Sequence, residues 1–194
     1  MPKEMGKKAV QILQVIALIA IITSTSYAAA DKGDEKKVYH NEKWDLMLLY
    51  PDGWTYTEEY RDNVPVVMYP PEDKGPDGFV MAYFLGEKVF KDIDEFKKHF
   101  EEKYLASYEK HEIIVTLLSE TKEGYKAIDY RYTYVDDEKK TFVCDCRLTI
   151  TATQACWMMS YDRPKGGSEA VEKEAQEIMQ SIIFAATDYL TKEE

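Results

Sequence analysis

Three tyrosines are the residues in this sequence whose type and spacing best suit ligand recognition. Tyr130, Tyr132 and Tyr134 alternate with polar residues along one expected strand. Because successive side chains of a strand point to opposite faces, the three rings share one face. The row either packs beneath a helix or lines a groove, and a groove with an acidic rim would suit a cationic or polar ligand or an extended peptide. These tyrosines are the candidate ligand-binding residues.

Catalytic and cofactor-binding motifs are missing from the sequence. Three histidines are present, His40, His99 and His111, and none of them lies in a known catalytic motif. The chain contains no Gly-x-Ser-x-Gly elbow, no His-Glu-x-x-His pair and no phosphate-binding loop motif. We therefore assign no residue to catalysis and no cofactor. An exported hydrolase-type enzyme stays open as an alternative, and it would require His40 or His111 to meet an acidic residue in the fold.

One acidic run could in principle hold a hard cation through its oxygens. Asp136, Asp137 and Glu138 are consecutive, but they lack the alternating spacing of a calcium loop. We expect them to form a hairpin turn and assign no metal ligand. A divalent-cation-binding protein is the second alternative left open.

The three cysteines lie in an expected β-hairpin. Alternation places Cys144 and Cys146 on one face, and a turn within residues 151–154 would place Trp157 on that face and Cys156 on the other. Thiols in these positions pair poorly, so we expect buried, unpaired cysteines. A Cys-x-Cys metal or redox site is the alternative, although no nearby histidine or fourth thiol supports it.

The N-terminus has the order of a bacterial signal peptide. Lysines precede an apolar run over residues 9–22, and small residues follow up to Ala30. The apolar run is shorter than the ~20 residues of a spanning helix, and the leader has no cysteine that could accept a lipid. We therefore expect no stable membrane anchor after cleavage. The predicted organisation is a signal peptide at 1–30, a flexible charged linker at 31–37, one domain at 38–187 and a charged tail at 188–194.

The charge balance limits the classes of partner. The chain has a formal net charge of -11, yet 45% of its residues are hydrophobic and fifteen are tyrosines. Such a composition is typical of a globular domain. An acidic surface repels polyanions, so the sequence disfavours nucleic acid and anionic lipid as partners.

Periodicity predicts an α+β fold, in which a meander of antiparallel strands is flanked by helices. Asp92 and Glu95 form a capping box that begins one helix, and Gly166, Gly167 and Ser168 precede the last one. The Pro51-Asp52-Gly53 turn predicts a hairpin between the strands on either side of it. The expected strands are 44–50, 54–60, 64–69, 79–85, 113–120, 125–135 and 141–150 with its hairpin partner.

The run from Tyr39 through Tyr50-Pro51-Asp52-Gly53-Trp54 resembles the opening of PsbP-like and Mog-type α/β/α sandwich domains. It is most similar to the bacterial secreted branch, which includes the DcrB-like lipoproteins. The resemblance extends in order of elements to about Phe184, and it implies an antiparallel sheet flanked by helices. It also implies a non-enzymatic role in binding or assembly at a membrane surface. No functional residue is carried over, because Tyr50 and Trp54 look structural.

These observations predict an exported, non-enzymatic binding or accessory protein of the bacterial cell envelope. We expect it in the extracellular or periplasmic space. The expected partner is an envelope protein or a small polar or cationic ligand.

Overall fold

The computed structural model describes residues 36–72 and 78–184. The predicted signal peptide, most of the linker and the charged tail lie outside the described residues. The first strand begins at Lys37, where the linker was expected to end. Among the described residues, no helix is long and apolar enough to cross a membrane.

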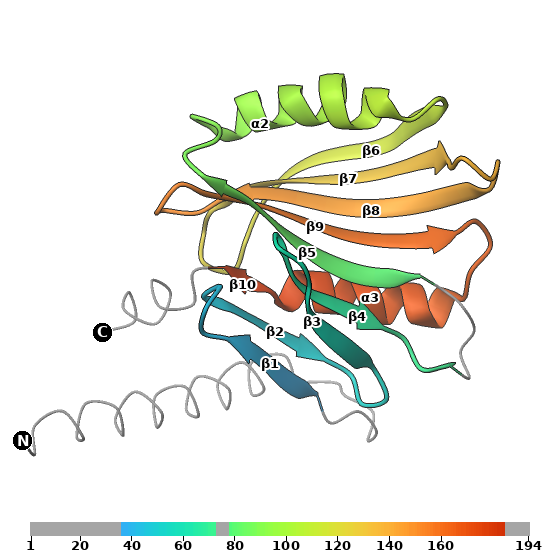
Figure 1. Ribbon diagram of the computed structural model, residues 1–194, viewed down its shortest axis with the longest axis horizontal. Coiled ribbons are helices and arrows are strands. Elements are labelled where there is room, and N and C mark those ends of the chain that lie inside the picture. Colours follow the sequence, from blue (N-terminus) through green and yellow to red (C-terminus); the bar gives the residue numbers. More distant parts are fainter. Residues whose placement is uncertain (1–35, 73–77, 185–194) are drawn as a thin grey trace, which may run out of the picture. The chain divides into compact units, whose positions relative to one another are not determined.

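Two antiparallel sheets organise the domain (Figure 1). The larger sheet has seven strands in the order β3-β4-β5-β9-β8-β7-β6, and the smaller has three in the order β1-β2-β10. The strands of the larger sheet are β3 (Thr55–Arg61), β4 (Val64–Tyr69), β5 (Phe79–Glu87), β6 (His111–Glu120), β7 (Lys126–Val135), β8 (Thr141–Ile150) and β9 (Ala155–Pro164). Those of the smaller sheet are β1 (Lys37–Asn41), β2 (Leu46–Tyr50) and β10 (Ile183–Phe184).

Helices lie on both faces of the larger sheet. On one face, α2 (Ile93–His99) continues into the π-helical turn η2 (Phe100–Tyr104) and the 3-10 turn η3 (Leu105–Ser107). On the other face, α3 (Glu169–Ser181) packs together with the small sheet (Figure 1). The predicted α+β architecture, with an antiparallel meander flanked by helices, is confirmed.

The helix starts follow from local chemistry. The Asp92 side chain accepts a 2.9 Å hydrogen bond from the Glu95 amide, as the capping box predicts. The Glu95 carboxylate accepts from the amide of Lys91, one residue before the cap. Both contacts satisfy backbone amides that would otherwise lack a partner at the helix start.

Two hydrophobic cores result, one on each face of the larger sheet. Strand β9 contributes to both, because its side chains alternate. Trp157, Met159 and Tyr161 enter the core under α3, whereas Cys156 and Met158 enter the core under α2. The α3 core also takes the apolar stripe of the helix, namely Val171, Ala175, Ile178, Met179 and Ile182.

The expected facing of the cysteine hairpin is wrong. Ile150 lies opposite Cys156, and Thr149 lies opposite Trp157. All three cysteines therefore share the α2 face, and Trp157 points the other way. A one-residue difference in register reverses every side chain of a strand, because the side-chain period is two. The expectation of buried, unpaired thiols is confirmed.

The hairpin predicted at Pro51-Asp52-Gly53 is also wrong. The turn itself forms, and Gly53 has the expected positive φ of 85°. However, β2 pairs with β1 and β10 in the small sheet, while β3 pairs with β4 in the large one. The turn thus carries the chain from one sheet to the other.

Candidate ligand-binding site

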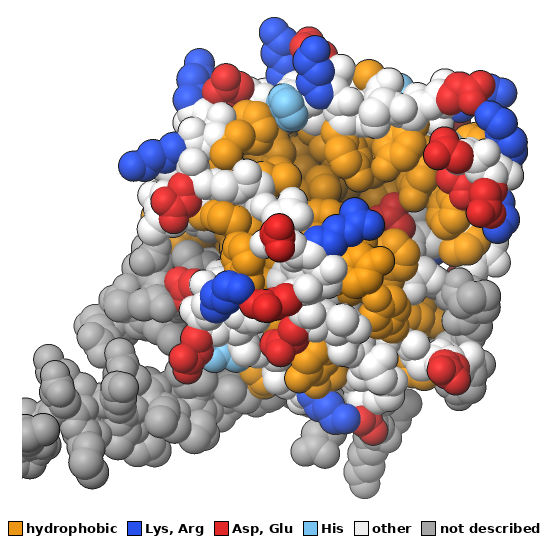
Figure 2. Space-filling model, viewed as in Figure 1, with side chains coloured by type: hydrophobic (Ala, Val, Ile, Leu, Met, Phe, Trp, Pro, Cys, Tyr) orange, Lys and Arg blue, Asp and Glu red, His pale blue; other side chains and the backbone are white. Residues whose placement is uncertain are grey.

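The α2 face of the larger sheet carries a group of half-buried tyrosines around one carboxylate. We call Tyr83, Tyr104, Tyr108, Tyr134 and Asp162 the tyrosine site. Tyr83, Tyr104, Tyr108 and Tyr134 border the α2 core without being fully buried. Figure 2 shows hydrophobic side chains gathered in a hollow below α2, with basic and acidic side chains at its edge.

Strand register places Asp162 at the centre of this site. On β9, Asp162 lies opposite Phe79 of β5 on one side and Cys144 of β8 on the other. Its carboxylate accepts a 3.1 Å hydrogen bond from the Tyr134 hydroxyl. Strand β7 thereby supplies the donor and β9 the acceptor.

Tyr104 and Tyr108, which we call the aromatic wall of the tyrosine site, come from the segment that begins directly after α2. Tyr108 stacks on Tyr134 with ring centroids 4.3 Å apart, and its hydroxyl donates to that of Tyr104 at 3.3 Å. Tyr134 stacks in turn on Phe142 at 5.4 Å. The π-helical turn η2 and the 3-10 turn η3 bring Tyr104 and Tyr108 over the end of β7, where a regular helix would carry the chain elsewhere.

Burial dominates the electrostatics of the site. Desolvation raises the pKa of Asp162, and it outweighs the hydroxyl and thiol groups that stabilise the charged form. Desolvation raises the pKa of Tyr83, and the nearby Asp162 charge raises it further. Desolvation also raises the pKa of Tyr134, again with a contribution from Asp162. Over the described residues, no basic side chain forms an ion pair with Asp162.

The predicted tyrosine row divides between core and site. Tyr130 and Tyr132 are buried beneath η2, where their rings contact Phe100 at centroid distances of 4.9 and 6.0 Å. The Tyr130 hydroxyl donates a 2.9 Å hydrogen bond to Glu101. Tyr134 alone of the three belongs to the tyrosine site.

The histidines and the acidic run lie on separate elements of the described chain. His40, His99 and His111 are exposed and lie on β1, α2 and β6 respectively. The run at 136–138 forms the predicted turn, in which the Asp136 carboxylate accepts from the Lys140 amide at 2.8 Å. Within the described ranges, no three His, Cys, Asp or Glu side chains are grouped so that they could hold a metal ion.

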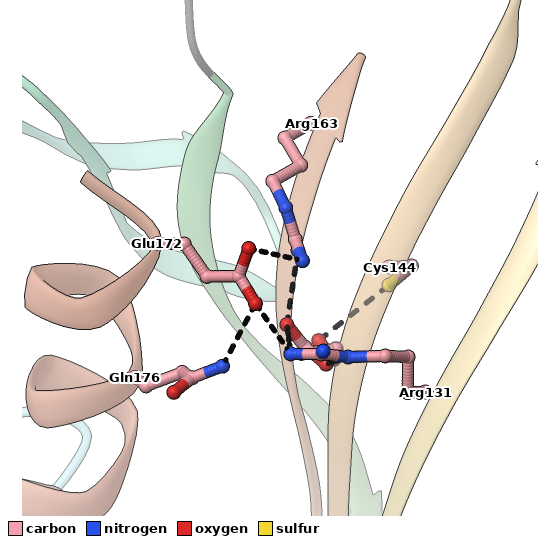
Figure 3. Close-up of polar contacts among 6 residues, drawn as sticks. Arg131, Cys144, Arg163, Glu172 and Gln176 are labelled. Atoms are coloured by element: carbon pink, nitrogen blue, oxygen red, sulfur yellow. Dashed lines mark hydrogen bonds and ion pairs between the residues drawn. The ribbon is translucent and has the colours of Figure 1, made fainter. Parts of the chain in front are cut away.

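An ion-pair network occupies the opposite face, between the sheet and α3 (Figure 3). Asp145 receives hydrogen bonds from Arg131 at 2.6 Å and from Arg163 at 2.9 Å. Glu172 of α3 binds the same two guanidinium groups at 2.6 and 2.9 Å, and Gln176 at 3.2 Å. Two arginines and two carboxylates thus neutralise one another. We interpret this network as an anchor for α3 rather than a ligand site.

Sequence reasoning missed Asp162, Tyr83, Tyr104 and Tyr108. The available signal was Asp162 itself, an acidic residue that continues the inward-facing series Cys156, Met158 and Ser160 on one strand. The wrong register of the hairpin placed this series on the other face and concealed it.

Comparisons with known proteins identify the fold. No family model matches the chain, and no curated protein matches it in sequence. Several solved structures share its fold at 13 to 15% sequence identity.

Three of the similar structures come from different organisms. Cyanobacterial PsbP from Synechocystis sp. PCC 6803 has a TM-score of 0.54 and 13% identity, covering 81% of this chain and 97% of that one. The Ran-binding protein Mog1p of Saccharomyces cerevisiae has a TM-score of 0.54 and 15% identity, covering 81% and 99%. LpqN of Mycobacterium tuberculosis, described as involved in cell envelope biogenesis, has a TM-score of 0.55 and 13% identity, covering 78% and 91%.

The chain therefore has the PsbP/Mog-like fold. This confirms the resemblance noted at Tyr50-Pro51-Asp52-Gly53-Trp54. Its placement in the secreted, DcrB-like branch stays a prediction. At this level of identity the likeness extends to the fold and not to the activity.

Proposed function

We propose that this protein is an exported, non-enzymatic accessory protein of the bacterial cell envelope, and that its tyrosine site binds a small ligand carrying an amine or quaternary ammonium group. The fold is shared with LpqN, whose description places it in cell envelope biogenesis, and with PsbP. The description of LpqN supports the cell-envelope part of the proposal.

The observation that carries the proposal is the buried Asp162 carboxylate, which lies among aromatic side chains and forms no ion pair within the described residues, although the charge of Arg163 acts on it. Burying an isolated carboxylate is unfavourable unless an opposite charge or hydrogen bonds compensate for it. The faces of tyrosine rings attract cations, and carboxylates attract them more strongly. Asp162 accepts a hydrogen bond from Tyr134, on which Tyr108 stacks, so a carboxylate and aromatic side chains lie together.

The raised pKa of Asp162 predicts how ligand affinity depends on pH. The pKa of Asp162 is raised by burial, so a bound cation competes with a proton for the same carboxylate. Affinity for an ammonium ligand should therefore rise with pH through the raised pKa of Asp162. Below that pKa, binding should be accompanied by release of a proton.

Isothermal titration with choline and with its uncharged isostere 3,3-dimethylbutanol tests the proposal. We expect choline to bind more tightly. At pH values below the raised pKa of Asp162, we also expect a proton-release signature in buffers of different ionisation enthalpy. Asp162→Asn should weaken choline binding by about tenfold or more, which corresponds to ~1.4 kcal/mol, and leave the isostere unaffected. Tyr108→Leu should weaken choline selectively, because it removes an aromatic face.

The matched control is Asp137→Asn, which removes an exposed carboxylate from the hairpin turn and should leave binding unchanged. Equal affinity for choline and its isostere, or loss of choline binding in Asp137→Asn as large as in Asp162→Asn, would contradict the ligand class.

Export is tested separately by cell fractionation of the full chain. We expect a processed form, shorter by about thirty residues, outside the cytoplasm. A full-length form confined to the cytoplasm would contradict the envelope role while leaving the ligand test standing.

A further inference from the structure

A second polar side chain lies next to Asp162 on the α2 face of β9. Residues two positions apart on a strand point to the same face, so Ser160 and Asp162 are neighbours there. Ser160 lies opposite Cys146 of β8 on one side and Met81 of β5 on the other. Its hydroxyl is therefore placed between side chains that offer it little hydrogen bonding.

The Ser160 hydroxyl is buried without a hydrogen-bond partner. Ser160 is 2% exposed, and its Oγ forms no hydrogen bond within the described part of the chain. By contrast, the buried Thr149 hydroxyl on β8 donates to the Lys126 carbonyl at 3.0 Å. Buried polar groups are nearly always paired, because an unpaired one is destabilising. An unpaired hydroxyl beside the candidate carboxylate therefore indicates a group whose partner is a ligand.

Ser160 and Asp162 are close enough to contact one ligand atom. Burial raises the pKa of Asp162, and the nearby Ser160 hydroxyl acts on it in the opposite direction, although the two groups lack the geometry of a hydrogen bond. The Asp162 carboxylate accepts a 3.1 Å hydrogen bond from Tyr134. A carboxylate can accept about four hydrogen bonds and a hydroxyl oxygen two. Both side chains thus have the capacity to accept further donors.

We propose that the tyrosine site selects a primary ammonium group, which donates hydrogen bonds to the Asp162 carboxylate and to Ser160 Oγ together. This inference rests on the proposed function, because it specifies the head group of the same ligand. A primary ammonium has three N–H donors, whereas a quaternary ammonium has none. A quaternary ion would be attracted by the carboxylate but would leave the Ser160 hydroxyl unpaired. Sites built to hydrogen-bond a ligand group reject analogues that lack it.

Methylation of the ligand nitrogen distinguishes hydrogen bonding from the other contacts of the site. Each added methyl group increases the apolar surface that binding can bury, which favours the complex. The tyrosine rings also attract a quaternary ammonium group. If only charge, ring faces and apolar burial acted, affinity would rise with methylation. Hydrogen bonds to Asp162 and Ser160 predict the reverse order, because each methyl group replaces one N–H donor.

Isothermal titration of the purified protein with ethanolamine, its N-methyl and N,N-dimethyl derivatives and choline tests the order. At neutral pH all four carry one positive charge and the same hydroxyethyl group. We expect ethanolamine to bind about tenfold or more tightly than choline, as hydrogen bonds to a charged group allow, with the other two between them. Choline binding as tightly as ethanolamine would overturn this inference and leave the proposed function standing. If none of the four bound, both would fail.

Ser160→Ala tests the role of the hydroxyl. The variant should weaken ethanolamine by about fivefold or more and leave choline unchanged, so the ratio of the two affinities falls. Its melting temperature should be no lower than that of the wild type, because the oxygen removed has no hydrogen bond in the folded domain. Ser119→Ala is the matched control, since the Ser119 hydroxyl bonds to Asp129 on the opposite face of the sheet. An unchanged affinity ratio in Ser160→Ala would refute selection by Ser160.

Discussion

The Tyr134 hydroxyl and the Asp162 carboxylate form a hydrogen bond of 3.1 Å across strands that are not neighbours. Strand β8 lies between β7 and β9, so the contact passes over Cys144 of that strand. The long tyrosine side chain spans the intervening strand, and it ties the carboxylate to the aromatic wall. The geometry of the site therefore depends on three adjacent strands keeping their register.

Replacing Asp162 by asparagine should change how stability depends on pH. Burial raises the folded-state pKa of Asp162 above the unfolded value of about 3.9. The folded wild type should therefore lose stability as pH rises from about 4 through the raised pKa, by ~1.4 kcal/mol for each unit of the shift. Asp162→Asn keeps the size and an acceptor for Tyr134 but lacks this loss.

Urea unfolding at several pH values measures the effect. Wild type and Asp162→Asn should have similar free energies of unfolding at pH 4, and the variant should be more stable at pH 8. Asp137→Asn serves as the control with no such difference. If Asp162→Asn were the less stable protein at pH 8, the raised pKa would be refuted.

Removing the charge of Glu172 should loosen α3. Glu172→Gln leaves the buried Arg163 guanidinium with one carboxylate partner instead of two. We expect a loss of about 2 kcal/mol in the free energy of unfolding, below the value for a fully buried pair because Glu172 is partly exposed. Chemical denaturation compares it with Glu169→Gln, an exposed residue of the same helix, for which the change should be small. Equal effects of the two variants would show that the network contributes little.

Gly78 should tolerate no side chain. It has a φ of 95°, and a Cβ there would lie 2.0 Å from the carbonyl oxygen of Asp162. Gly78→Ala therefore combines backbone strain with a clash against β9. Gly124 also has a positive φ, of 82°, but open space around it. Gly124→Ala should lower the free energy of unfolding by about 1 kcal/mol, and Gly78→Ala should lower it by several times that amount.

Thermal unfolding of the two alanine variants separates strain from clash. Similar melting temperatures for both would mean that the strand moves aside without penalty, contrary to this expectation.

Thiol labelling should follow global unfolding. Cys144, Cys146 and Cys156 are all buried, and burial raises the pKa of the Cys144 and Cys146 thiols, so few reactive thiolates form. We expect no labelling by a thiol reagent in the native protein and three labelled thiols in denaturant. Rapid labelling of one thiol under native conditions would reveal local opening of the α2 core.

Local patterns of sequence predicted most of the elements. Asp92 and Glu95 began a helix because a capping box acts over four residues, and the strand Val64–Tyr69 was predicted with its observed bounds. Alternation placed Tyr130, Tyr132 and Tyr134 on one face. These features depend on residues that are close together in the sequence, so the sequence is sufficient to predict them.

Pairing between distant segments was not predictable in the same way. The Pro51-Asp52-Gly53 turn is compatible both with a hairpin and with a crossing between sheets. One of the two partners of β2 is β10, more than a hundred residues away. The facing of Cys156 and Asp162 depended on a single residue of register. The site was missed because it is assembled from β5, β7, β9 and the turns after α2, whose proximity arises only from the tertiary fold.

Because β9 contributes side chains to both cores, it also affects how the domain unfolds. Trp157, Met159 and Tyr161 hold one core, Cys156 and Met158 the other, and the strand is bonded to β5 and β8 along its length. Neither side can detach while β9 remains in place, so the two halves should melt as a single unit. In hydrogen–deuterium exchange, the β9 amides should be the last to exchange, and they should do so at one common free energy equal to that of global unfolding.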